Sequence, residues 1–160
     1  MTNGRGQRLP GAVISTVGVV GLPEPDRRQL SLPPEPEAAS LARALVADAC
    51  HAWGLPRLLY PARLVMSELA LNAVEHAGTD LVVTVERRGA ALHLAVADGV
   101  ATLPRLREPG RPRGGAPLDD RGRGLRTVQA TASAWGATPT AAGKVVWAVV
   151  RASAADRPRR

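Results

Sequence analysis

The spacing of apolar and polar residues predicts one α/β domain with its elements in a defined order. Apolar residues recur at helical spacing in two long segments, and the second of these ends at Gly78, a residue suited to a helix C-terminus. Gly89 and Ala90 join two apolar runs at the spacing of a tight β-hairpin. The predicted elements are a short strand within 27–40 that ends at Pro33 and Pro34, helices at about 36–52 and 59–77, strands at 80–88 and 91–98, a helix at 122–133, and strands at 134–140 and 143–151.

Three segments lack this periodicity. Residues 1–26 mix Gly, Pro and Arg around one apolar run, so we expect a partly disordered extension in which that run adds at most an edge strand. Residues 99–121 are rich in Pro, Gly and Arg, and so long a loop inside a compact domain is usually functional or mobile. The last residues, 152–160, form a basic tail that we expect to be disordered. The folded domain is therefore predicted to span 27–151.

Composition changes this picture in a few respects. Hydrophobic residues make up 45% of the 160 positions, but with three Trp, one Tyr and no Phe the core must consist of Ala, Val and Leu. The net charge of +7 comes almost wholly from scattered arginines without interleaved aromatic residues, so direct nucleic-acid binding is not indicated. The single cysteine, Cys50, excludes an internal disulfide, and we expect it to be packed. The apolar run at 11–22 is too short to span a bilayer, so we expect a cytoplasmic protein with no membrane partner.

The stretch "SELALNAVEHA", residues 67–77, contains the first candidate site. Glu68, Asn72 and His76 lie four residues apart and so form a polar stripe on one face of the predicted helix. A carboxylate and a carboxamide one turn apart could hold a water, a hydroxyl or a hard metal ion. The alternative is a half-exposed helix whose polar face meets solvent, with His76 as an ordinary helix-end residue.

Two later motifs extend this candidate site. Asp98 continues the apolar row of its strand and is followed by Gly99, although Asp-Gly also commonly starts a turn. The segment "GRGL", Gly122 to Leu125, opens the third predicted helix. Taken alone, it would be an undistinguished loop.

In this order the three motifs resemble the nucleotide-binding (Bergerat) fold of the GHKL superfamily, which DNA gyrase, a heat-shock chaperone, histidine kinases and the mismatch-repair ATPase share. The chain is most similar to the small bacterial anti-sigma-factor serine kinases, over roughly residues 28–150. The resemblance implies a two-layer α/β sandwich, with a mixed, mostly antiparallel sheet and helices on one face. It also implies that ATP and Mg²⁺ are the cofactors.

The resemblance also assigns roles to residues. Asn72 would ligate Mg²⁺, and Glu68 would be the catalytic residue that orients or deprotonates the attacking hydroxyl. Asp98, with Gly99 beside it, would accept a hydrogen bond from the adenine amino group. Nucleotide phosphates would meet the helix start formed by Gly122, Arg123, Gly124 and Leu125, where exposed N–H groups favour anions. Residues 99–121 would form a lid.

The function that the resemblance implies is an ATP-dependent serine/threonine protein kinase that binds a sigma factor and phosphorylates a small antagonist protein. Homodimers are common among such relatives. The chain departs from the family pattern in two places: no further glycine closely follows Gly99, and Val145 stands where a Thr often helps to hold adenine. The alternative is therefore a non-catalytic regulatory module with the same fold that binds ATP weakly or not at all.

Overall fold

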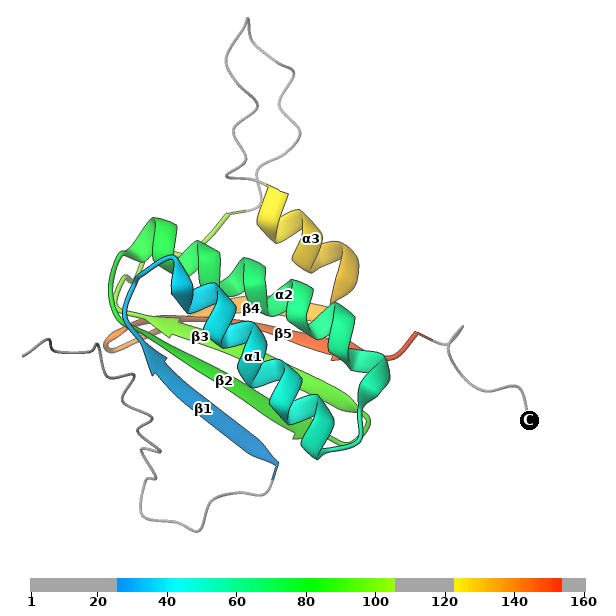
Figure 1. Ribbon diagram of the computed structural model, residues 1–160. Coiled ribbons are helices and arrows are strands. Elements are labelled where there is room, and N and C mark those ends of the chain that lie inside the picture. The colour runs from blue at the N-terminus through cyan, green and yellow to red at the C-terminus, as the bar shows by residue number, and fades with distance from the viewer. Residues whose placement is uncertain (1–25, 106–122, 154–160) are drawn as a thin grey trace, which may run out of the picture.

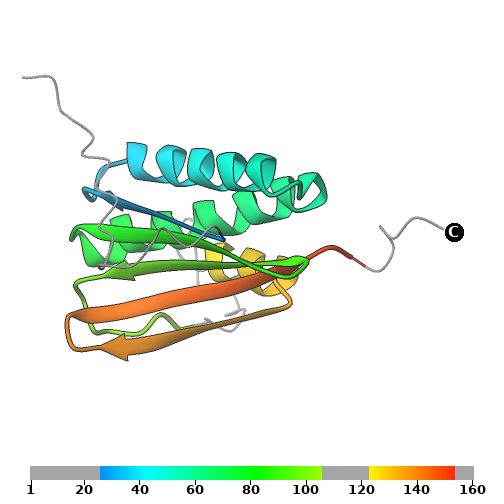
Figure 2. The same ribbon diagram turned by 90° about the horizontal axis from the view of Figure 1, so that it is seen from below.

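The computed structural model describes residues 26–105 and 123–153, without the side chain of Arg123. These residues form two layers, a five-stranded sheet and three α-helices packed on one of its faces (Figures 1 and 2). The elements are β1 (Arg27–Leu32), α1 (Glu37–Ala52), η1 (Pro56–Leu58), α2 (Leu59–Asn72), η2 (Ala73–Ala77), β2 (Leu81–Arg88), β3 (Ala91–Asp98), α3 (Arg123–Thr131), β4 (Ala134–Thr140) and β5 (Gly143–Arg151).

The sheet has the strand order β1-β2-β3-β5-β4. All four described pairings are antiparallel, so the predicted two-layer α/β sandwich is confirmed, and the described sheet contains no parallel pair. The last strand along the chain, β5, lies between β3 and β4. This arrangement brings the beginning of β5 beside the end of β3, where Asp98 is opposite Lys144.

Every predicted helix and strand is present, and the observed bounds differ from the predicted ones by few residues. The second helix differs in kind, because its last turn, η2, is a π-helix that begins directly after Asn72. Gly78 then ends it with a left-handed φ of 61°, a conformation that glycine adopts without steric cost. π-helical turns inside or at the end of α-helices are frequent at functional sites.

The core lies between the helices and the sheet and consists of the small aliphatic side chains that the composition predicts. Its fully buried members come from both long helices and from the central strands, and Val128 of α3 is also fully buried. Trp53 and Trp135 are only partly buried and pack at its periphery. Cys50 is buried, as predicted. The largest fully buried side chains include Leu58, Met66, Leu69, Leu81, Leu92, Leu94 and Val65.

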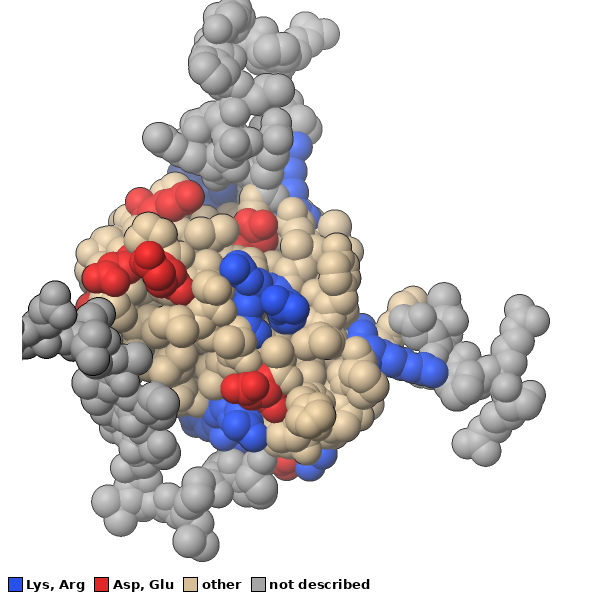
Figure 3. Space-filling view, in the orientation of Figure 1, with Lys and Arg blue, Asp and Glu red and all other residues tan. Residues whose placement is uncertain are grey.

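Basic and acidic side chains are interspersed on the face shown in Figure 3, with no continuous basic stripe. Within residues 26–105 and 123–153, no helix is long and apolar enough to cross a membrane. The predicted apolar run at 11–22, most of the predicted lid, Gly122 and most of the basic tail lie outside the described residues. The expectations for those segments stay predictions.

Candidate functional site

A cavity of about 620 Å³ lies where the C-terminal end of α2 meets the sheet. Its size is typical of small-molecule sites, which are mostly apolar and contain a few placed polar groups. The apolar walls include Leu69 of α2, Leu125 of α3, and Val96 and Val146 of the central strands. Its polar lining includes Asn72, His76, Asp98 and Lys144.

Asp98 and Lys144 form a buried ion pair at the wall of this cavity. The Lys144 Nζ donates a hydrogen bond of 2.9 Å to Asp98 Oδ1 and lies 2.9 Å from Oδ2. The exposed fraction of the side chain is 1% for Asp98 and 7% for Lys144. Asp98 Oδ1 also accepts the Val100 N–H at 2.9 Å, and Lys144 donates to the Val100 carbonyl oxygen at 3.0 Å. The two charges therefore neutralise each other in a closed group of hydrogen bonds.

Gly143 is the reason that Lys144 can lie so close to Asp98. A Cβ atom at position 143 would collide with the Asp98 carbonyl oxygen and would lie 2.7 Å from the carbonyl carbon of Gly99 and 2.8 Å from its Cα. These are main-chain atoms, which cannot rotate away as the end of a side chain can. Only glycine therefore lets the start of β5 pack against the end of β3 in this way.

Asn72 and His76 reach the cavity from the end of the second helix. Asn72 is the last residue of α2 and is half-buried, whereas His76 lies in η2 and is exposed. Both line the cavity, so two members of the predicted polar stripe face the same space. Asn72 of the helix and the sheet residues Asp98 and Lys144 thus line the same cavity.

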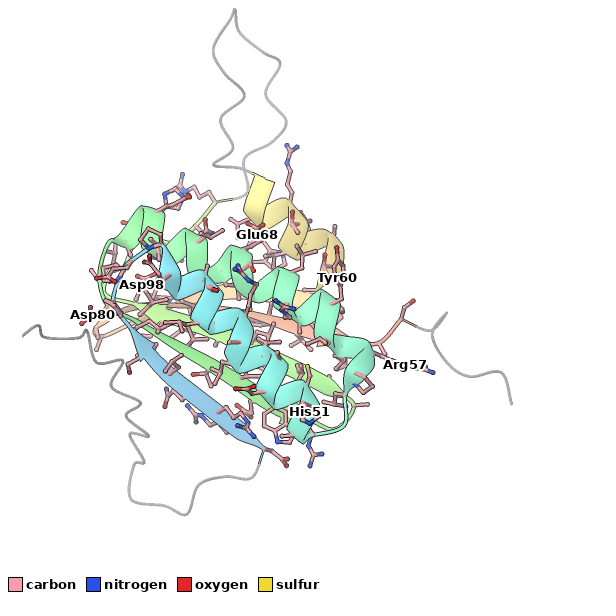
Figure 4. The ribbon with its side chains drawn as sticks, viewed as in Figure 1. His51, Arg57, Tyr60, Glu68, Asp80 and Asp98 are labelled. Atoms are coloured by element: carbon pink, nitrogen blue, oxygen red, sulfur yellow. The ribbon has the colours of Figure 1, made fainter. Side chains whose placement is uncertain are left out.

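Glu68 lies one turn before Asn72, at the contact between α2 and α3 (Figure 4). A Cβ atom on Gly124 would be 2.6 Å from Glu68 Oε2, so the first turn of α3 packs closely on this carboxyl group. Burial, and secondly the nearby charge of Glu75, raise the pKa of Glu68 above its ordinary value. A carboxyl group with a raised pKa is better suited to accept a proton at neutral pH.

Replacing Glu68 by glutamine should stabilise the fold at neutral pH. Between the ordinary pKa of 4.5 and the raised pKa, the folded state keeps a proton that the unfolded chain has lost. The free energy of unfolding therefore falls as pH rises through this window, and the loss is complete above the raised pKa. Glutamine does not titrate, so the Glu68→Gln variant should melt at a higher temperature than the wild type at pH 7. Melting curves across pH should show this difference vanish below pH 4.5, and a difference independent of pH would contradict the argument.

The other predicted site residues are placed differently. Leu125 lines the cavity, and Gly124 contacts Glu68 instead. Gly99 does not line the cavity; its N–H donates to Thr79 Oγ1 at 2.8 Å. Gly122 and the side chain of Arg123 lie outside the described residues. The phosphate contact expected at the start of α3 and the nucleotide contact expected of Gly99 thus stay predictions.

The structure corrects the expectation that Val145 replaces a Thr that would help to hold adenine. Side chains alternate between the two faces of a strand, and the β5 residues that line the cavity are Lys144 and Val146. Val145 pairs with Ala97 on the opposite face of the sheet. A Val at this position therefore removes no group from the cavity.

Lys144 is the site residue that sequence reasoning missed. It is the only lysine in the chain and follows a glycine at the start of a predicted strand. This position of Lys144 could have been noticed in the sequence, but its pairing with Asp98 could not have been predicted. The pair forms only because β5 lies next to β3 in the register that sets Lys144 opposite Asp98.

Among the described residues, no group of three or more His, Cys, Asp or Glu side chains could hold a metal ion. Magnesium differs from zinc in that it keeps several waters and needs only one or two protein oxygens when phosphates complete its shell. The carboxamide oxygen of Asn72 at the cavity fits that requirement. The cavity size, its apolar walls and the Asp98–Lys144 pair likewise fit a purine nucleotide.

A family model described as a histidine kinase-like ATPase domain matches residues 32–150. The matched segment lies within the predicted domain and includes the whole cavity lining. No curated protein matches the chain.

Proposed function

The chain belongs to the family of histidine kinase-like ATPase domains, and from this premise we propose that it is an ATP-dependent serine/threonine protein kinase of the anti-sigma-factor type. The family assignment makes it an ATP-binding domain of regulatory type. The kinase proposal is supported chiefly by the position of Glu68, a carboxyl group one helical turn from the cavity residue Asn72 and close to the first turn of α3.

Each of three side chains has a distinct task in this proposal. Asp98 accepts a hydrogen bond from the purine amino group. Asn72 would hold Mg²⁺ through its carboxamide oxygen, and the ion would supply positive charge that stabilises the charge developing during phosphoryl transfer. Glu68 orients the acceptor hydroxyl and takes up its proton. The raised pKa of Glu68 supports this last task, because proton transfer is most efficient when the pKa of the base approaches the working pH.

The proposed partners follow from the resemblance to the anti-sigma-factor serine kinases. The kinase would bind a sigma factor and transfer phosphate to a serine or threonine of a small antagonist protein. It would also act as a homodimer.

Mg-ATP should raise the melting temperature of the protein. A ligand that binds only the folded state stabilises it by mass action, by about 2.7 kcal/mol at a concentration 100 times its dissociation constant. Thermal unfolding with and without millimolar Mg-ATP measures this effect, and Asp98→Ala should largely remove it. An unchanged melting temperature for the wild type would count heavily against nucleotide binding.

A second candidate function, a regulatory module that transfers no phosphate, is favoured by one observation. The carboxylate of Asp98 is already paired with Lys144, which would weaken nucleotide binding if the ammonium group had to be displaced. The two candidates differ in outcome when the protein is incubated with radiolabelled Mg-ATP and antagonist-type proteins of the same organism. Phosphoserine or phosphothreonine on one of these proteins would establish the kinase.

A further inference from the structure

Lys144 has more hydrogen-bonding capacity than its described partners use. An ammonium group has three N–H donors. One direction is taken by the Asp98 carboxylate, whose two oxygens both lie 2.9 Å from Nζ, and a second by the Val100 carbonyl oxygen at 3.0 Å. In the described part of the chain no third acceptor contacts Nζ. One N–H is therefore left, on a side chain that lines the cavity.

Asp98 also keeps spare capacity. A carboxylate has about four acceptor positions. The Val100 N–H and the Lys144 ammonium group occupy Oδ1, and Lys144 also approaches Oδ2. At least one position on Oδ2 remains. The ion pair therefore offers a ligand an acceptor and a donor side by side.

Stability alone is a weak explanation for this pair. Taking two charges out of water costs free energy that their attraction often fails to exceed, and well-packed apolar residues at such positions are frequently as stable. Here the neighbouring β5 and β3 residues on the same face, Val146 and Val96, are apolar. These two residues pair with each other and line the same cavity, so the two strands do not need a charged pair to pack at this wall.

We propose that Lys144 recognises the base directly, by donating its remaining N–H to the ring nitrogen N1 of a 6-aminopurine nucleotide. This inference rests on the proposed nucleotide site and adds a residue to it. Adenine carries an acceptor, N1, next to a donor, its 6-amino group. The Asp98–Lys144 pair presents the complementary order, with the carboxylate for the amino group and the ammonium for N1. Hypoxanthine and guanine have an N1–H donor and a 6-carbonyl acceptor, which is the reverse order.

The sharpest probe is 1-deaza-ATP, which keeps the amino group and the phosphates but has a C–H in place of N1. Calorimetric titration of the full chain should show that the wild type binds ATP about 10-fold tighter than 1-deaza-ATP, because the analogue leaves a charged donor unpaired. Lys144→Met, which keeps a side chain of similar length without donors, should bind the two nucleotides equally. Val145→Met is the matched control, since it places the same side chain one residue further on, facing away from the cavity. It should retain the wild-type preference.

The outcomes separate this inference from the proposed function. Equal wild-type affinity for ATP and 1-deaza-ATP would overturn the role of Lys144 while leaving nucleotide binding intact. This comparison uses only the wild type, so poor folding of Lys144→Met would not prevent the test. A Lys144→Met variant that loses affinity for both nucleotides in equal proportion would show that Lys144 only supports the fold. One that binds ATP more tightly than the wild type would show that Lys144 competes with the base. Failure of the wild type to bind either nucleotide would overturn the nucleotide site itself.

Discussion

Replacing Glu68 by glutamine is expected to lower phosphoryl transfer by roughly 10²–10⁴-fold, the usual contribution of a positioned general base. Glutamine keeps the size of the side chain and its contact with α3 but cannot take up a proton. The affinity for Mg-ATP should change little, because Glu68 does not line the cavity in which Asp98 and Asn72 lie. Single-turnover transfer to a phosphoacceptor partner, measured beside nucleotide titrations, separates the two effects.

Glu75→Gln is the matched control, since it removes an exposed carboxylate from the same helical segment. It should retain transfer at neutral pH. Because the charge of Glu75 helps to raise the pKa of Glu68, the pH profile of transfer should shift to lower pH in this variant. Transfer at the full rate in Glu68→Gln would remove Glu68 from the mechanism.

Asn72→Ala should behave differently from both glutamate variants. The carboxamide lines the cavity, and its loss removes the proposed magnesium ligand. Binding of Mg-ATP and transfer should therefore both decrease, whereas binding of ATP without the metal should be affected less. Equal losses with and without Mg²⁺ would mean that Asn72 contacts the nucleotide and not the metal.

Gly143→Ala is expected to cause the largest loss of stability among the substitutions considered, on the order of 3 kcal/mol in the free energy of unfolding. The added Cβ would overlap main-chain atoms of Asp98 and Gly99, so the start of β5 would have to move away from the end of β3. That movement would also separate Lys144 from Asp98. Chemical denaturation measures the stability, and nucleotide titration of the folded fraction should show weaker binding.

Gly89→Ala separates the steric effect from the conformational one. Gly89 lies in the β2–β3 hairpin with a φ of 61°, and a Cβ there would meet no atom within 4 Å. Its cost should therefore be only that of a left-handed residue, about 1–2 kcal/mol, with no effect on nucleotide binding. Comparable losses in the two variants would show that the collision at position 143 is relieved without movement of β5.

Hydrophobic periodicity alone was enough to predict the elements, because it depends on residues close together in the chain. The helix over 59–77, the hairpin around Gly89 and the final pair of strands all occur where the pattern places them. The aliphatic core follows in the same way from a composition without Phe. The π-helical turn after Asn72 has no signal in this pattern, since one widened turn hardly changes the spacing of apolar residues. The short helix η1 at Pro56–Leu58 was not predicted either.

The candidate site was predictable as a set of motifs but not as an arrangement. Asn72, Asp98 and Leu125 line one cavity although they are far apart in the sequence. The motifs resemble a known fold, and this resemblance is the reason that the sequence groups them into one site. The resemblance predicts a phosphate contact for Gly124, but it does not predict that the hydrogen side chain of Gly124 leaves room for Glu68.

The identity of the β5 residue at the cavity was decided by tertiary structure alone. Side chains alternate along a strand, so a shift of one residue in register exchanges every side chain between the two faces of the sheet. The sequence shows that Lys144 and Val145 begin a strand, and nothing within that strand tells which of them faces the helices. Pairing with β3 turns Lys144 toward Asp98 and Val145 away from it. Local pattern thus determined which segments are strands, whereas contacts between distant segments determined which of their residues form the site.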